Sequence, residues 1–150
     1  MQTIEFENKI GYKFLDKNLL IRALTRKALA YEKPLENHQE AFCVLGDAII
    51  KVVLCDLLIK KGLETKGQIT QKKAFLENEK ILAEIGRSMN LDDYIITNEG
   101  EKSTNIFKGD RAIAETLEAI IAAIYSDQGF VYAKEVVTFL FKNKLKQTYT

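Results

Sequence analysis

The sequence predicts an all-α domain of six or seven helices. Apolar residues recur at helical spacing through most of the 150-residue chain. The chain holds only 8 glycines and 1 proline, and it contains no Asn-Gly or Asp-Gly pair of the kind that favours a β-hairpin. Its length is that of one domain, so we expect residues 1–150 to fold together.

The first two predicted helices are bounded by residues typical of helix ends. Asp16 is a good N-cap for the first helix, and this helix must end before Pro34, because the residue before a proline is pushed out of the helical region. The second helix is expected from Asn37 to about Lys61, where Gly62 suits its C-terminus. Its middle is apolar on almost every side, so we expect a buried central helix.

The rest of the chain predicts four further helices and one loop. In order, these are a short helix after Ile69, a helix after Asn78, a long mobile loop from Leu91 to Asn105, a helix over Asp110–Ser126 and a last helix over Val131–Lys146.

The composition excludes several classes of protein. Lys and Arg number 22 against 21 Asp and Glu, so a uniformly basic nucleic-acid binder is excluded, and any nucleic acid would have to meet a local basic patch or bound metal ions. No uncharged stretch reaches the ~18 residues of a membrane span, and the first ten residues lack the apolar segment of a signal peptide. We therefore expect a cytoplasmic protein with no membrane contact.

The cysteines do not predict a zinc site. Cys43 and Cys55 lie twelve residues apart, and His38 is the single histidine. This pattern does not match the ligand spacing of a zinc site. We expect both cysteines to be buried, reduced thiols.

Two pairs of carboxylates interrupt apolar helices. Glu40 and Asp47 are seven residues apart, so they lie on nearly the same side of the central helix. Gly46 precedes Asp47, and a glycine inside a helix costs roughly 1 kcal/mol, which suggests close approach of another helix or a ligand. Glu115 and Glu118 share one face of a later helix. Carboxylates that converge between buried helices, without His or Cys, point to Mg²⁺ or Mn²⁺.

Each carboxylate also has a purely structural interpretation, and spacing alone leaves both open. Asn37 and Glu40 have the spacing of a capping box. Arg111 and Glu115 are at i, i+4, as in a solvated ion pair, and Lys51 follows Asp47 at the same spacing.

A lysine-rich segment lies between residues 60 and 80, with six lysines against three glutamates. It is either a solvated helix face or a patch that follows a phosphate backbone. The chain has no tryptophan to stack on single-stranded bases, so backbone contact with a duplex is the better functional interpretation.

Six short segments, taken in order, resemble the signatures of the ribonuclease III family. They are Ile10–Phe14 (IGYKF), Leu19–Thr25 (LLIRALT), Glu40–Ala48 (EAFCVLGDA), Lys66–Thr70 (KGQIT), Glu115–Ala119 (ETLEA) and Ala123–Phe130 (AIYSDQGF). The resemblance covers nearly the whole chain. It implies an all-α homodimer that cleaves double-stranded RNA with Mg²⁺ (or Mn²⁺), one catalytic centre per subunit.

The resemblance also implies roles for individual residues. It implies that Asp47 and Glu118 are catalytic, and that Asp47, Glu115 and Glu118 hold the metal with help from Glu40. The implied RNA-binding residues are Lys66, Thr70, Lys72 and Lys73, and the implied dimer-interface residues are Phe42 and Val44.

The chain departs from the family's signatures at several positions. Cys43 stands where the family has a metal-binding glutamate, and Glu115 stands where it has an aspartate. Lys66 replaces an acidic residue, Arg26 a histidine and Ala28 a serine. The family's double-stranded-RNA-binding domain does not follow, so we expect a stand-alone nuclease domain. These departures leave a second hypothesis open, a catalytically impaired RNA- or ribosome-binding module of the same fold.

Overall fold

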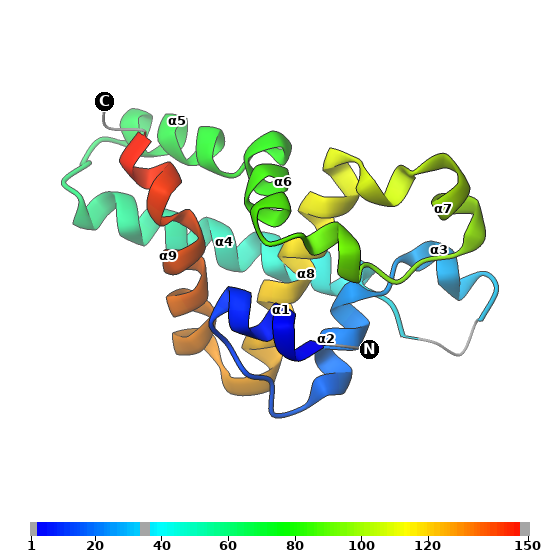
Figure 1. The fold of residues 1–150 in the computed structure, drawn as a ribbon. Helices are drawn as coiled ribbons and strands as arrows, with labels where there is room; N and C mark the ends of the chain where they lie inside the picture. The colour runs from blue at the N-terminus through cyan, green and yellow to red at the C-terminus, as the bar shows by residue number, and fades with distance from the viewer. Residues whose placement is uncertain (1–2, 34–36, 148–150) are drawn as a thin grey trace.

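The structure is a computed structural model that describes residues 3–33 and 37–147, and it is all-helical, as the sequence predicts (Figure 1). Within these residues there are nine α-helices and two 3₁₀ helices. In chain order they are α1 (Thr3–Ile10), α2 (Lys17–Leu24), α3 (Lys27–Ala30), α4 (Glu40–Lys60), α5 (Lys66–Leu76), α6 (Glu79–Ser88), η1 (Leu91–Tyr94), α7 (Glu99–Thr104), η2 (Ile106–Lys108), α8 (Asp110–Gln128) and α9 (Phe130–Gln147).

Helix α8 lies at the centre of the molecule and packs against α2, α4, α6 and α9 (Figure 1). Eleven of its residues are buried, and many of them are alanines, which let neighbouring helices approach closely. One such close approach is to α4 at Gly46. A Cβ on Gly46 would lie 1.7 Å from the backbone oxygen of Glu118, which leaves no room for a side chain. The close approach that the sequence suggests at Gly46 is therefore confirmed.

Several predicted helix ends are confirmed because the signals that set them are local. Asn78 caps α6 by accepting a hydrogen bond from the backbone N–H of Ile81 at 2.8 Å. Gly62 follows the end of α4 with φ +102°, a conformation that favours glycine. Helix α5 begins earlier than predicted, at Lys66, because Thr65 caps it. Helix α1 has no counterpart among the predicted helices.

The first predicted helix starts correctly at Asp16 but is not continuous. Helix α2 ends at Leu24 because Thr25 takes an extended conformation and forms an isolated parallel β-bridge with Ile96. The chain then turns into the short helix α3. Pro34, which was expected to end a single helix, lies outside the described residues.

The predicted start of the central helix at Asn37 is wrong. Helix α4 begins at Glu40, whose N–H donates to the Nδ1 atom of His38 at 3.3 Å. The Glu40 carboxylate binds Lys27 Nζ at 3.0 Å, so the capping box is not formed. Gln39 accordingly occupies the N-cap position.

The prediction that α4 is buried all round is only half correct. Val44, Val52 and Ile59 are 72%, 50% and 56% exposed, although the opposite side of the helix lies in the core. Their separations of eight and seven residues place them on one side of the helix. None of the described helices is long and apolar enough to cross a membrane.

The predicted loop from Leu91 to Asn105 is wrong in most of its length. The segment forms η1, the bridge to the first part of the chain and helix α7. Asn98 caps α7 by accepting from the N–H of Glu101 at 2.9 Å, and its side-chain amide donates to the carbonyl of Ala28 at 3.0 Å. These contacts hold α7 beside α3 (Figure 1).

Candidate active site

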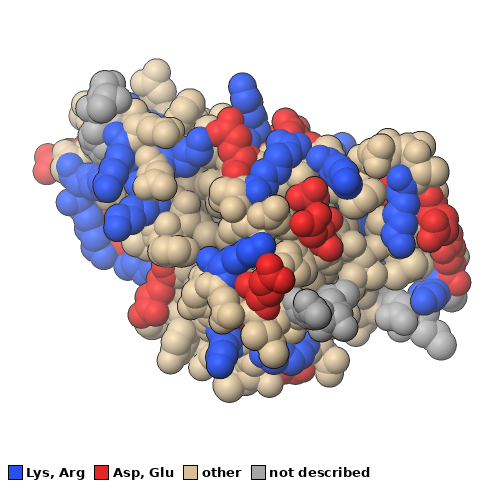
Figure 2. All heavy atoms as spheres, in the orientation of Figure 1, with Lys and Arg blue, Asp and Glu red and all other residues tan. Residues whose placement is uncertain are grey.

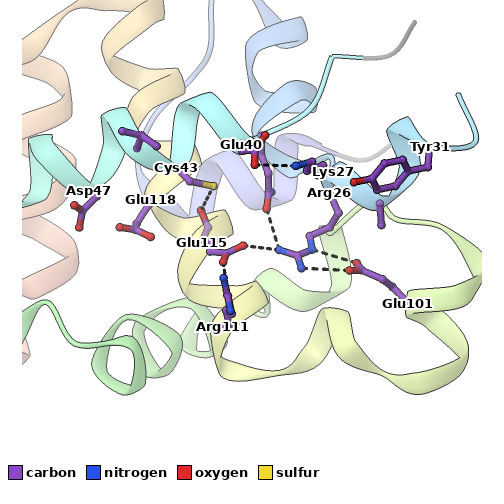
Figure 3. A pocket seen from close by; sticks show the side chains of 13 residues that line it. Arg26, Lys27, Tyr31, Glu40, Cys43, Asp47, Glu101, Arg111, Glu115 and Glu118 are labelled. Atoms are coloured by element: carbon purple, nitrogen blue, oxygen red, sulfur yellow. Dashed lines mark hydrogen bonds and ion pairs between the residues drawn. The ribbon is translucent and has the colours of Figure 1, made fainter. Parts of the chain in front are cut away.

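One pocket of about 740 Å³ contains all four acidic residues singled out from the sequence. Glu40 and Asp47 come from the first half of α4, and Glu115 and Glu118 from the first half of α8 (Figure 3). The two helices bring the pairs together because they cross at Gly46. The structure thus brings the acidic face of α4 and the acidic face of α8, which are far apart in the sequence, into one pocket.

Asp47 and Glu118 form a carboxyl pair at one end of this pocket (Figure 3). Burial, and after it the Asp47 carboxyl beside it, together raise the pKa of Glu118 from its ordinary 4.5 to about 8. Asp47 also binds Lys51 Nζ at 2.8 Å, and Lys51 lies 3.4 Å from Glu77. Near neutral pH the pair is thus stabilised by a proton and a lysine.

Glu115 has different partners. Its carboxylate accepts from Arg26 at 2.9 Å and from Arg111 at 2.8 Å. Arg26 also forms a two-pronged ion pair with Glu101 of α7 and donates to the side chain of Gln39 at 3.2 Å. The Arg111–Glu115 pair expected from i, i+4 spacing is present, but Arg26 adds a second guanidinium from a distant part of the chain.

Cys43 lies near both Glu115 and Glu118 and carries a neutral thiol (Figure 3). Its Sγ donates to the backbone carbonyl of Glu115 at 3.2 Å. Burial, and after it the nearby carboxylates of Glu115 and Glu118, together raise the pKa of the thiol to about 12. The thiol therefore stays protonated at neutral pH and is a poor ligand for a hard cation. Both Cys43 and Cys55 are free, as expected, but they are half-buried rather than fully buried.

The donor chemistry of the pocket fits a divalent cation at Asp47 and Glu118. These are oxygen ligands, and the close approach of two carboxyl groups is costly without a proton or a cation between them. The other two candidate ligands are engaged, Glu40 by Lys27 and Glu115 by its arginines. Among the described residues, no three His, Cys, Asp or Glu side chains are arranged to hold a metal ion together.

Glu101 is a pocket residue that sequence reasoning missed. It was assigned to a loop, yet α7 brings it to within 3.1 Å of Arg26. A local signal existed, because Asn98 followed three residues later by Glu101 is the spacing of a helix N-terminus. Arg26 was noted only as a departure from a signature, and nothing local indicated its partners.

The predicted RNA-binding residues lie outside the pocket, on α5, which packs against α4. Lys66 and Thr70 are exposed, whereas Lys72 and Lys73 are half-buried. Lys73 pairs with Glu77 at 3.2 Å, so a chain of ion pairs through Lys51 links α5 to Asp47. Figure 2 shows further Lys and Arg side chains gathered at the end of the molecule where the C-terminal part of α9 lies beside α5.

The two predicted dimer-interface residues differ in exposure. Val44 is 72% exposed, but Phe42 is only 7% exposed. The Phe42 ring lies in the core with the guanidinium of Arg22 over it, 4.2 Å from the ring centroid. Phe42 therefore offers little surface to a partner. The exposed apolar face of α4 is made by Val44, Val52 and Ile59 instead.

Comparison with known proteins gives consistent matches. The sequence profile of the Ribonuclease-III-like family matches residues 16–145. The chain is 36% identical over 149 residues to ribonuclease 3 of Campylobacter jejuni, covering 98% of this chain and 65% of that protein. It is 37% identical over 136 residues to ribonuclease 3 of Streptomyces coelicolor, covering 90% of this chain and 49% of that protein.

The solved structures show the same likeness. The nuclease domain of ribonuclease III from Campylobacter jejuni, described for structural flexibility in a region involved in dimer formation, matches with a TM-score of 0.88 and 33% identity. The match covers 95% of this chain and 97% of that domain. The chain thus spans less than two thirds of the length of these two curated relatives, but nearly all of the isolated nuclease domain.

Proposed function

The chain belongs to the ribonuclease III family, and we propose that it is a divalent-cation-dependent endoribonuclease that cleaves double-stranded or structured RNA. The observation that carries the proposal is the pocket in which α4 and α8 bring Asp47 and Glu118 together across the contact at Gly46. Two carboxyl groups, of a largely buried Glu118 and a partly exposed Asp47, lie close together at the crossing of two central helices, and such a pair adds nothing obvious to stability. It suits the binding of a cation and a phosphodiester.

In this proposal Asp47 and Glu118 would hold Mg²⁺ or Mn²⁺. When bound, the cation supplies an activated water and stabilises the leaving oxygen of the phosphodiester. Lys27 and Arg111 line the same pocket and keep exposed positive charge at its rim, where a phosphate backbone would approach. Lys51 orients the Asp47 carboxylate through their 2.8 Å contact.

The RNA partner would lie across the pocket and α5. We assign backbone contacts to Lys66, Thr70, Lys72 and Lys73, which lie on the helix connected to Asp47 through the ion pairs of Lys51. Because the net charge is only +1, such binding depends on this local surface and weakens steeply with salt.

The active form would be a homodimer. The exposed apolar face of α4, made by Val44, Val52 and Ile59, is a surface that a monomer would leave in water. A second copy of the chain would cover it, and the Campylobacter jejuni nuclease domain has a region involved in dimer formation. The free thiols Cys43 and Cys55 fit a cytoplasmic location.

The test is cleavage of a labelled RNA duplex at low salt with Mg²⁺, Mn²⁺ or Ca²⁺ in parallel. Glu118→Gln keeps the shape of the side chain and removes its charge. We expect a loss of roughly 100-fold or more, because the charge contribution is worth several kcal/mol. Glu135→Gln, the same change at an exposed position of α9, is the matched control and should cleave normally. Full activity of Glu118→Gln, with circular dichroism unchanged in both variants, would contradict the assigned role.

A second candidate function is RNA or ribosome binding without cleavage. The observation that favours it is the neutral thiol of Cys43 beside the two carboxyl groups of Glu115 and Glu118. Under this hypothesis the chain binds a duplex, and none of the three cations converts binding into cleavage. A large gain of Mg²⁺-dependent cleavage in Cys43→Glu would then show that the missing carboxylate limits the natural protein.

A further inference from the structure

Arg26 is a largely buried cation among the residues that line the acidic pocket. Its side chain is 13% exposed, and it reaches the pocket from the start of α3, next to the bridge between Thr25 and Ile96 (Figure 3). One edge of the guanidinium contacts both carboxylate oxygens of Glu101, at 3.1 and 3.3 Å. The remaining donor contacts Glu115 at 2.9 Å. A two-pronged pair of this kind fixes both the position and the orientation of the charge.

The partners of Arg26 are themselves held in place. Glu101 accepts from Thr97 Oγ1 at 2.6 Å, and its backbone N–H is capped by Asn98. Gln39, which accepts from Arg26, donates to the carbonyl of Ala23 at 2.8 Å and contacts Thr116 Oγ1 at 3.1 Å. Arg26 is therefore part of a rigid network that joins α2, α4, α7 and α8.

Glu115 meets two arginines that differ greatly in burial. Arg111 is 83% exposed, so water can replace its contact at little cost. Arg26 is 13% exposed, so moving it away would leave Glu101 partly buried without its cation. A divalent cation that used Glu115 would have to displace this second, buried guanidinium.

From this arrangement we infer that Arg26 serves as the site's built-in cation, which holds Glu115 away from divalent cations and confines their binding to Asp47 and Glu118. The inference rests on the proposed function only in taking that carboxyl pair as the cation site. Arg26 is a positioning residue here, because it acts through Glu115. The consequence is weak cation binding through two carboxylates, although four line the pocket.

The experiment is a titration of the full chain with MnCl₂, without RNA, followed by calorimetry and by the electron paramagnetic resonance signal of free Mn²⁺. Arg26→Gln removes the charge but keeps a polar side chain. We expect Mn²⁺ to bind about tenfold more tightly, which is ~1.4 kcal/mol, or to fill a second site. Arg111→Gln removes a charge from the same carboxylate at the surface and should change the affinity by less than about threefold.

A double variant tests whether the effect passes through Glu115. The gain in Arg26→Gln should disappear in Arg26→Gln/Glu115→Gln, because the released carboxylate is then absent. Arg26→Lys keeps the charge without the planar fork and should show a smaller gain. It also serves as the test if the glutamine variant does not fold.

The outcomes separate this inference from the proposed function. Equal effects of Arg26→Gln and Arg111→Gln, or no gain in any Arg26 variant, would overturn the inference. A gain that persists without Glu115 would overturn it as well. Tighter Mn²⁺ binding in a protein that never cleaves RNA would support the inference and refute the proposed function.

Discussion

Of the described glycines, Gly46 is the one at which an added Cβ would come closest to another atom, so Gly46→Ala tests the contact between α4 and α8 most directly. The new Cβ would lie 1.7 Å from the backbone oxygen of Glu118 and 2.4 Å from its carbonyl carbon, whereas ordinary contact begins at 3.4 Å. Helices α4 and α8 would have to separate by roughly 1.7 Å, because neither contacting atom belongs to a flexible side chain. Overpacking of this kind costs ~1–3 kcal/mol, and backbone contact between two central helices places the cost near the upper end.

The expected result is a loss of thermal stability. For a chain of this size each kcal/mol lowers the melting temperature by roughly 2–4 °C, so Gly46→Ala should melt about 6–12 °C below the natural protein. Thermal unfolding followed by circular dichroism measures this. Gly67→Ala is the matched control, since a Cβ at Gly67 in α5 meets nothing within 4 Å. Its melting temperature should be unchanged or slightly higher, because alanine favours the helix.

Activity should fall further than stability in Gly46→Ala. Separating α4 from α8 also separates Asp47 from Glu118, so RNA cleavage and Mn²⁺ binding should be lost at temperatures where the variant is still folded. A variant that melts with the natural protein and keeps its activity would show that the two helices are not in backbone contact at Gly46.

Three further predictions follow from local contacts. Asn78→Ala removes the side chain that caps α6 through Ile81 and should cost ~1 kcal/mol in denaturant unfolding, while an unchanged midpoint would show that the cap is dispensable. Cys43 should react with Ellman's reagent at pH 8 more slowly than Cys55, because burial raises the pKa of its thiol to about 12; single-cysteine variants measure the two rates, and equal rates would contradict the burial. Since the pKa of Glu118 is raised from 4.5 to about 8, the folded chain binds a proton that the unfolded chain has released, so the free energy of unfolding should fall as pH rises between these values. Glu118→Gln should flatten that slope, and an unchanged slope would assign it to other groups.

Helices with strong local signals could be predicted from the sequence alone. Helices α6, α8 and α9 follow from apolar periodicity, and the Asn78 cap comes directly before the residues it caps. The break after α2 could not be predicted in this way. Thr25 leaves the helix to pair with Ile96, and the hydrogen bonds of that bridge depend on a segment far along the chain. Helix α7 was mistaken for a loop because it is short and has no buried residue to give it an apolar pattern.

The candidate site also has features that the local sequence predicts and features that depend on distant parts of the chain. The sequence by itself determined that Glu40 and Asp47 share one face of a helix, that Glu115 and Glu118 share another, and that Gly46 allows close approach. Helical geometry relates residues three, four or seven apart whatever surrounds them.

Only the tertiary structure decided how these carboxylates are paired. Asp47 lies beside Glu118, whereas Glu115 faces Arg26 and, through it, Glu101. These partners lie on different helices, and their distances follow from how α3, α4, α7 and α8 pack. Electrostatic interactions depend on distance and burial in space, and neither quantity can be read from spacing along the chain.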